Sequence, residues 1–430
     1  MDRMRHVVTA LDAADVADIV RDAGRAGFRI AANPAVNPAS SLAAAPATRL
    51  TASLTPSLAS NPASNPATDP TPHHCHPPSD DTLLLNTAAL TDLTICPSSR
   101  TARVGAAVTT SQLASAAASH GLLAIPGSSP HATAINAVLT GGLGRTARHH
   151  GLASDHAVAF EVVDADGNRL RASAHENEDL FWALSGGSGD FAIVTAMEVR
   201  LHATPDLTTR TTAWPLDSAE DVLRAFRDIA AAAPDNLMLQ LTLSPSEVLV
   251  CATFLGSAND ARVLLEPLIA VPGATTLADA PRQPTAPQTA LLSGLDDTAP
   301  WIRLSERLPY LTGAAGPSRP ATAQLTVRLQ HLGGQLSRYS TKGPHGPVTE
   351  QFLLAMTGPA AEHHDDLVVA LGITVSPRKT LDLLSPDEPP SRAFGTEELT
   401  LLREIKAAWD PAGLFVGDYF AAGQQLAGVG

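Results

Sequence analysis

The stretch "PGSSPHATAINAVLTGGLGR", residues 126–145, contains four glycines among other small residues. Small side chains allow a backbone to approach a ligand closely and to point its N–H groups at phosphate or ring oxygens. The stretch therefore favours a loop that holds a flat, phosphate-bearing cofactor. The alternative stays open that Gly127, Gly141, Gly142 and Gly144 serve tight turns only.

A second group of chemically capable residues is "HHCHPP", residues 73–78. Three His and one Cys are metal-binding types. They lie, however, in a stretch of Pro, Ala, Ser, Thr and Asn that has no period of 2 or 3.6. Such a segment offers no fixed ligand geometry, so we expect a low-complexity insertion over 38–80 and no metal site.

Charge and composition exclude several classes of protein. The net charge is −14, whereas proteins that bind nucleic acids usually carry a positively charged surface. No apolar run approaches the roughly 20 residues that cross a bilayer. The first residues do not resemble a signal peptide, and the three scattered cysteines, Cys75, Cys96 and Cys251, suit a reducing cytoplasm. We expect a cytoplasmic protein with a small-molecule partner, and the sequence leaves the oligomeric state open.

The elements around the glycine-rich loop predict an α+β fold. Residues 6–36 have the pattern of strand, helix and strand. Residues 157–173 have that of a hairpin around "DADG", and residues 191–201 that of a long strand. From 205 to 375, strand-like runs alternate with helices, which predicts an antiparallel sheet covered by helices. Residues 395–415 predict a helix with a Pro stop.

The continuous stretch 101–205 resembles the FAD-binding domain of the vanillyl-alcohol oxidase superfamily, in the branch near berberine bridge enzyme and oligosaccharide oxidases. "HLGGQLSR" and "EQFLLAMTG" resemble its substrate domain, and "REIKAAWDPAGLF" resembles its last helix. The resemblance implies a two-part PCMH-type FAD-binding domain over 1–204, a substrate domain over 205–375 and a returning segment over 376–430. Members of the family usually have a further segment before "VVTALDAADV".

The central loop keeps most of the family pattern. That pattern is Gly, any residue, Cys-Pro and, eleven residues on, Gly-Gly-aromatic-Gly. Its matches in this chain are Gly127, Pro130, Gly141, Gly142 and Gly144, with Ser128 at the variable position. Ser129 stands where a Cys bonds the flavin in bicovalent members, and Leu143 stands at the aromatic position.

The other flavin motifs depart further from the family. Residues 33–37 align with the family's Arg-Gly-Gly-Gly-His pyrophosphate loop, and all three of its glycines are replaced. Pro34 removes one N–H donor of that loop, and Asn37 stands at the position of the His that bonds the flavin. In "GGSGDFAIVT", Ile193 and Val194 keep a cofactor-binding position, but Asp190 replaces an Asn whose amide could donate hydrogen bonds. In the tail, Thr380, Leu381 and Asp382 align with a Tyr-any-Asn strand, and Asp418, Tyr419 and Phe420 align with Asn-Gln-Asn.

The resemblance implies an FAD-dependent oxidoreductase that acts on a small organic metabolite of secondary metabolism. Since Asn37 and Ser129 do not attack flavin as His or Cys does, we expect non-covalent FAD. Tyr419 and Asp418 are the candidate catalytic bases, and Tyr419 could equally be a packed residue. The alternative is a flavin-free descendant that acts as a non-redox cyclase or isomerase, or as a metabolite-binding protein.

Overall fold

The computed structural model describes residues 6–33, 81–125, 127, 129–204, 206–277, 288–293, 326–338, 340–357, 374–384, 388–417 and 419–420. The predicted insertion 38–80, the "HHCHPP" cluster and the site candidates Asn37, Ser128 and Asp418 lie outside these residues.

The chain begins with a small parallel sheet. Strands β1 (His6–Thr9) and β2 (Arg29–Asn33) flank β3 (Thr82–Asn86), and helix α1 (Ala13–Ala26) connects the first two. The Asp12 side chain accepts two backbone N–H groups at the start of α1, and Gly27 ends the helix with φ 75°. This confirms the predicted strand, helix and strand.

A five-stranded sheet follows, in the order β4-β5-β9-β7-β8. Its antiparallel strands are β4 (Leu93–Cys96), β5 (Thr101–Gly105), β7 (Ala157–Val163), β8 (Arg169–Ser173) and β9 (Ile193–Arg200). Salt bridges Arg103–Glu161 and Arg171–Glu198, each 2.7 Å, join half-exposed side chains across the strands. Buried residues of the sheet share one core with α2 (Thr110–Ala118), α3 (Ala134–Leu139), α5 (Glu178–Leu184) and the C-terminal helix α11 (Thr396–Trp409).

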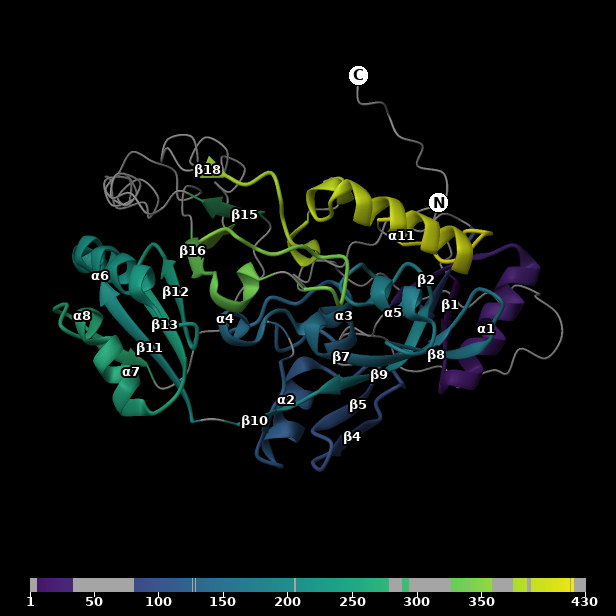
Figure 1. The fold of residues 1–430 in the computed structure, drawn as a ribbon, viewed down its shortest axis with the longest axis horizontal. Helices are drawn as coiled ribbons and strands as arrows, with labels where there is room; N and C mark the ends of the chain where they lie inside the picture. Colours follow the sequence, from purple (N-terminus) through teal and green to yellow (C-terminus); the bar gives the residue numbers. More distant parts are fainter. Residues whose placement is uncertain are drawn as a thin grey trace, which may run out of the picture.

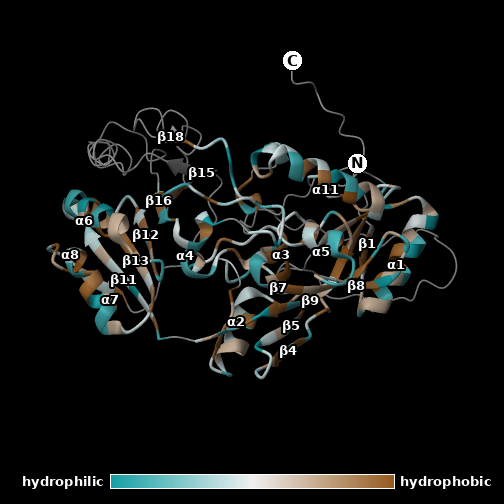
Figure 2. Ribbon diagram, in the orientation of Figure 1, coloured by the Kyte–Doolittle hydropathy of each residue, from teal (hydrophilic) through white to brown (hydrophobic). Residues whose placement is uncertain are grey.

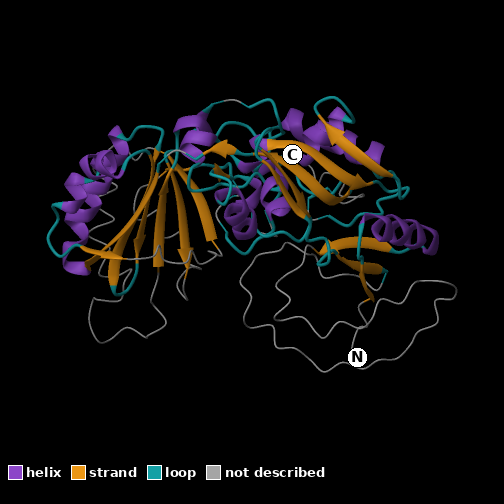
Figure 3. Cartoon of the chain, turned by 90° about the horizontal axis from the view of Figure 1, so that it is seen from below, coloured by secondary structure: helices purple, strands orange, loops and turns teal. Residues whose placement is uncertain are grey.

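The largest sheet has eight strands in the order β14-β11-β13-β12-β16-β17-β15-β18, with antiparallel pairing throughout. The strands are β11 (Leu207–Pro215), β12 (Leu237–Leu243), β13 (Glu247–Leu255), β14 (Thr275–Leu277), β15 (Gln288–Ser293), β16 (Thr326–His331), β17 (Phe352–Thr357) and β18 (Thr374–Val375). Helices α6 (Ala219–Ala232), α7 (Ala258–Leu264) and α8 (Glu266–Ile269) cover one face (Figures 1 and 3). Hydrophobic residues lie along β12 and β13, whereas α6 shows hydrophilic residues on its outer side (Figure 2). The α+β fold is confirmed, with the small parallel sheet as its one departure from antiparallel pairing among the described strands.

A short segment after the glycine-rich loop connects the five-stranded sheet to the eight-stranded sheet. It contains α4 (Ala147–His150) and the 3-10 helix η1 (Ala153–His156). The buried guanidinium of Arg148 donates to the carbonyls of Leu237, at 2.8 Å, and of Ala233, at 3.0 Å, and also to that of Leu332. One arginine thus satisfies carbonyl groups at the end of α6, at the start of β12 and just after β16.

Four histidines gather beside this segment: His149 and His150 on α4, His156 on η1, and His202 on β10 (His202–Ala203). The His150 carbonyl can only accept, so Nε2 of His156 donates to it over 3.1 Å. Nδ1 of neutral His156 then accepts from Nε2 of His202 over 3.0 Å. Protonation of His156 would place a second donor against His202.

The surroundings of the cluster favour neutral rings. Burial is the first cause and neighbouring positive charge the second; together they lower the pKa of His150 to about 3 and that of His156 to about 4. Burial also lowers the pKa of His202, followed by the charges of Arg200, His149, Lys342 and Arg100. Asp155 is the opposing group, since its charge raises the pKa of His156.

The cluster predicts acid sensitivity. An unfolded His has a pKa of about 6.5, so below that pH the unfolded chain binds more protons than the folded one and stability falls as the pH is lowered towards 4. Urea unfolding should show a lower midpoint at pH 5 than at pH 7. His156→Gln should reduce this difference, whereas His120→Gln, at an exposed position, should leave it unchanged. Equal pH dependence in wild type and His156→Gln would contradict the assignment.

Candidate cofactor and substrate site

The glycine-rich loop folds back on itself. Gly127 has φ +80°, and a Cβ there would lie 3.2 Å from the Ala137 Cβ. A Cβ on Gly144 would lie 3.5 Å from the Gly127 Cα. Gly127 and Gly144 are therefore neighbours across the loop, and a side chain on Gly127 would crowd Ala137.

Gly142 is the most constrained position of the loop. It has φ +71°, and a Cβ there would lie 2.6 Å from the Ala137 carbonyl oxygen and 2.7 Å from the Ala153 Cβ. Both neighbours belong to the protein, and the first is backbone that cannot move aside easily. Protein packing alone thus requires a glycine here, so the retention of Gly142 is no argument for a ligand.

The remaining loop candidates lie at the start of this fold. Ser129 is half-buried, and its carbonyl accepts from the Thr110 hydroxyl at the start of α2. Pro130 is exposed, and its carbonyl accepts from the Ser111 N–H at 3.2 Å. Gly141 is buried, with φ +99°.

A cavity of about 160 Å³ lies where the parallel sheet, the start of β9 and the C-terminal segment meet. Apolar side chains form most of its wall, Thr87 and Asn136 add a hydroxyl and an amide, and Asp190 adds a carboxylate. The predicted contacts Ile193 and Val194 belong to it, whereas the loop glycines do not. Its lining residues are Ile30, Ala31, Ala32, Thr87, Ala106, Ile135, Asn136, Leu139, Gly189, Asp190, Ala192, Ile193, Val194, Phe415, Val416 and Gly417.

The lining of this cavity fits part of a dinucleotide. Apolar side chains surround the space, and Thr87 and Asn136 can hydrogen-bond to a ligand in it. The volume is below the roughly 300–1,000 Å³ of a complete ligand site. The described residues therefore provide one portion of a cofactor site.

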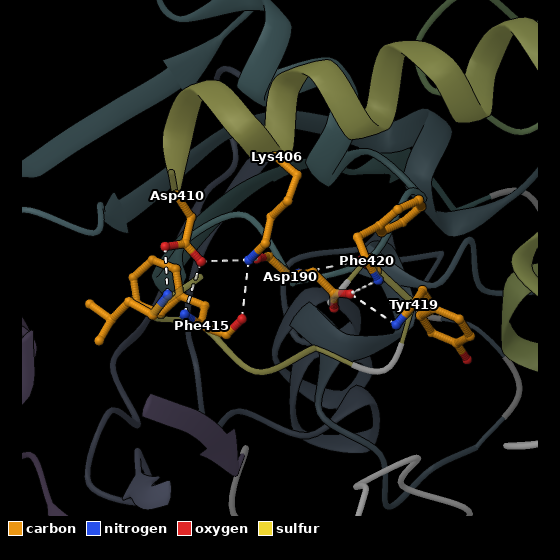
Figure 4. Close-up of polar contacts among 8 residues, drawn as sticks. Asp190, Lys406, Asp410, Phe415, Tyr419 and Phe420 are labelled. Carbon is orange, nitrogen blue, oxygen red and sulfur yellow. Dashed lines mark hydrogen bonds and ion pairs between the residues drawn. The ribbon is translucent and has the colours of Figure 1, made fainter. Parts of the chain in front are cut away.

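The C-terminal segment is held in this wall by Asp190 (Figure 4). Its Oδ2 accepts from the backbone N–H groups of Tyr419, at 3.0 Å, and Phe420, at 2.9 Å. Both bonds need only an acceptor, which a carboxylate provides as well as an amide oxygen does. The replacement of Asn by Asp is thus compatible with the local structure.

A buried lysine completes this attachment. The Lys406 ammonium, on α11, donates to the Asp190 carbonyl and the Asp410 carboxylate, each at 2.6 Å, and to the Phe415 carbonyl at 3.1 Å (Figure 4). Asp410 in turn accepts from the N–H groups of Leu414, at 2.7 Å, and Phe415, at 2.9 Å. The ion pair therefore fixes the chain that borders the cavity.

Tyr419, the candidate base within the described residues, belongs to the core of the five-stranded sheet. Its exposed fraction is 8%, and it packs in the same cluster as Phe420 and Phe191. It does not line the cavity described above. This position favours the alternative of a packed residue.

Asp382 is a buried acid that the motif alignment placed but gave no role. It lies in the 3-10 helix η6 (Leu381–Leu383), and its Oδ2 accepts from the Leu143 N–H at 3.4 Å. Burial raises the pKa of its carboxyl group above the usual range, although the Thr380 side chain and the Leu143 N–H act in the opposite direction. Nearby, a cavity of about 20 Å³ between Gly141, His345 and Lys379 has space for one water.

Sequence reasoning missed the polar inner face of the large sheet. Val327 and Leu329 pack towards the helices, so Arg328 and Gln330 occupy the opposite face. Register pairs them with Thr242 and Gln240 of β12. A polar residue at every second position of adjacent strands is the signal that could have identified this surface.

A larger groove, of about 630 Å³, lies elsewhere on the protein. It runs beside the ends of α1 and α11, where Phe28, Arg29 and Trp409 form part of its wall. None of its lining residues comes from the glycine-rich loop or the inner face of the large sheet.

In the described part of the chain, no group of three His, Cys, Asp or Glu residues is placed to hold a metal ion. Nor does any described helix have the length and apolar character of a membrane span.

The geometry at Gly142 predicts a stability effect that does not depend on a cofactor. Gly142→Ala should lower the free energy of unfolding by a few kcal/mol, about 1–3 from overpacking plus the cost of φ > 0. Gly144→Ala meets only contacts of 3.5 Å and longer and serves as the control. Urea unfolding of the cofactor-free protein measures both. Equal stability of the two variants would refute this explanation.

The Lys406 attachment predicts a large loss on removal of the cation. Lys406→Met leaves the Asp410 carboxylate buried without its ion pair, which should cost about 3–5 kcal/mol of unfolding free energy. Arg224→Met removes an exposed cation that pairs with Glu220 and Asp221 on α6, and should cost about 1 kcal/mol or less. Chemical unfolding of both variants tests the difference, and a loss at Lys406 as small as that at Arg224 would contradict it.

Part of the chain is similar in sequence to known FAD-binding proteins. Residues 69–173 match the FAD binding domain family. The chain is 35% identical to glucooligosaccharide oxidase of Sarocladium strictum over 136 residues, which are 31% of this chain and 27% of that protein. It is 32% identical to (R)-6-hydroxynicotine oxidase of Paenarthrobacter nicotinovorans over 127 residues, 30% of this chain and 28% of that protein. The matches thus span about a quarter of the length of these curated relatives.

Solved structures extend the similarity to the whole fold. BBE-like 1 of Physcomitrella patens has a TM-score of 0.73 and 16% identity, covering 97% of this chain and 92% of that one. The 6-hydroxy-D-nicotine oxidase of Arthrobacter nicotinovorans has a TM-score of 0.71 and 20% identity, covering 96% and 91%. The resemblance found in the sequence is confirmed: residues 69–173 match the FAD binding domain family, and the chain has the fold of the BBE-like proteins.

Proposed function

We propose that this protein is an FAD-dependent oxidoreductase that acts on a small organic molecule and binds its flavin non-covalently. The observation that carries the proposal is the cavity between β2, the start of β9 and the C-terminal segment. Thr87, Ala106, Ile135, Asn136 and Leu139 of its lining lie within the residues that match the FAD binding domain family. Apolar side chains dominate there and a few polar groups accompany them, as is usual for a cofactor site.

The proposed organisation has an FAD-binding domain over 1–204, a substrate domain over 205–375 and a returning segment over 376–430. Thr87 and Asn136 would hydrogen-bond to the cofactor, and Ile193 and Val194 would contact it. The sequence candidates Asn37 and Ser129 and the loop residues 127–144 are kept as proposed contacts. When bound, FAD would supply the hydride acceptor and pass electrons on to dioxygen or another acceptor.

The chain itself would position the substrate and move a proton. On the inner face of the large sheet, the half-buried Gln240 and Thr242 would contact the substrate. Asp418 and Tyr419 remain the proposed bases, although Tyr419 would have to leave its packed position to reach a substrate. A cytoplasmic location is proposed on the scattered cysteines, and a role in secondary metabolism on the family resemblance.

The purified protein should be yellow, with the visible absorption of oxidised flavin. Acid precipitation should release that colour into the supernatant, because neither Asn37 nor Ser129 provides a group that bonds to flavin. Colour in the pellet would overturn the non-covalent assignment, with His131 and His149 as the first anchors to test. A colourless protein that FAD cannot reconstitute would instead support the flavin-free alternative.

A charge placed in the cavity tests its role. Asn136→Asp should weaken FAD binding at least about tenfold, since a carboxylate there repels the cofactor's pyrophosphate. Asn259→Asp makes the same change at an exposed position on α7 and serves as the control. Titration of cofactor-free protein with FAD measures both. Wild-type affinity in Asn136→Asp would place the cofactor elsewhere.

A further inference from the structure

The 3-10 helix η6 lies where two hydrophobic clusters meet. Leu381 at its start is 3% exposed and packs in the core of the five-stranded sheet. Leu383 at its end packs against the cluster that contains Leu143 of the glycine-rich loop. Asp382 stands between these two leucines, so its carboxyl group is surrounded by packed side chains next to the loop.

The carboxyl group of Asp382 connects η6 to the centre of the loop. Its Oδ2 accepts from the N–H of Leu143 over 3.4 Å. Leu143 is itself 3% exposed, so water offers its N–H no ready replacement for this acceptor. Because Leu143 lies between Gly142 and Gly144, the bond holds the backbone in the middle of the glycine-rich stretch.

The surroundings of Asp382 do not suit a charged carboxylate. Its other oxygen, Oδ1, is buried and makes no hydrogen bond within the described residues. Lys379, the nearest cation in the sequence, pairs instead with Glu388, at 2.7 Å. A buried carboxylate with one long hydrogen bond and no counter-ion is costly, so the geometry favours the neutral acid. The raised pKa of Asp382 agrees, since burial is its first cause and no charged neighbour contributes to it.

The neutral acid also suits the groups nearby. Oδ2 still accepts from Leu143, whereas a proton on Oδ1 makes that oxygen a donor. The Thr380 hydroxyl is likewise buried without a partner in the described part of the chain, and a hydroxyl can accept a hydrogen bond. A donor and an acceptor are therefore present within three consecutive residues.

We propose that Asp382, as an uncharged acid, is a positioning residue that fixes the centre of the glycine-rich loop for flavin binding. It acts through the N–H of Leu143 and is not a base in the reaction. The proposal rests on the oxidoreductase function and adds the residue that keeps two proposed flavin contacts, Gly142 and Gly144, in place.

Two substitutions at one position test this by titration of the cofactor-free, full-length protein with FAD. Asp382→Asn keeps an acceptor oxygen and an uncharged donor, so its FAD affinity should stay within about twofold of wild type. Asp382→Leu leaves the N–H of Leu143 buried and unpaired, and should weaken FAD binding at least about tenfold. Asp206→Leu makes the same change at an exposed position and serves as the control.

Amide hydrogen exchange of the cofactor-free protein observes the bond itself. The N–H of Leu143 should exchange at least about tenfold faster in Asp382→Leu and at the wild-type rate in Asp382→Asn. The amides of β13, in the core under the helices of the large sheet, should keep their rates in both variants. Their rates separate a local release of the loop from a general loss of stability.

Wild-type FAD affinity in Asp382→Leu overturns the proposal and leaves the oxidoreductase intact. Unchanged exchange at Leu143 in that variant overturns it too, because the loop would then not depend on the bond. Loss of FAD binding in Asp382→Asn also overturns it, since the ionised carboxylate would then be required. Should Asp382→Leu lose its native far-UV dichroism, Asp382→Ala takes its place, and the expectation for Asp382→Asn is unaffected.

The two measurements also distinguish the proposal from the function on which it rests. Wild-type protein that never binds FAD contradicts the oxidoreductase and the role in flavin binding together. Faster exchange at Leu143 in Asp382→Leu would then retain only the hydrogen bond between η6 and the loop.

Discussion

The candidate cofactor site depends on one buried cation. The Lys406 ammonium group makes contact with the loop before β9, with the end of α11 and with the segment after it. The hydrogen bond from Lys406 to the Asp190 carbonyl joins residues that are 216 positions apart in the sequence. Burial of an ammonium group is costly unless carboxylate and carbonyl oxygens surround it. Its three contacts therefore hold the loop before β9 and the segment after α11 against the end of that helix.

The sequence predicts the regular elements well because their signals are local. Asp12 and Gly27 mark the ends of α1, and the "DADG" turn marks the hairpin of β7 and β8. The family resemblance then supplied what local signals cannot, the association of distant segments into one fold. Neither source indicated that Arg148 would satisfy carbonyls of the other sheet, because its partners at Ala233 and Leu237 are fixed only by the tertiary structure.

The candidate site was predicted less completely, for a physical reason. Motif matching identifies which positions keep a residue type but not what that residue contacts. Gly142 matches the family pattern, yet a side chain there would collide with Ala137 whether or not a cofactor is bound. Conversely, Arg328 and Gln330 match no family motif, and only the alternation along β16 and its pairing with β12 place them on the inner face of the large sheet.

The effect of a residue that departs from the family pattern depends on which hydrogen-bonding or reactive atoms the replacement adds or removes. At Asp190 the departure removes a possible donor, but both contacts in the structure use the side chain as an acceptor, so the exchange preserves them. At Ser129 the departure removes a thiol, which changes covalent chemistry and not the fold around the Thr110 bond to its carbonyl. The departures at Asp190 and Ser129 therefore leave the surrounding hydrogen bonds intact, and they bear on the chemistry of these two positions and not on the fold.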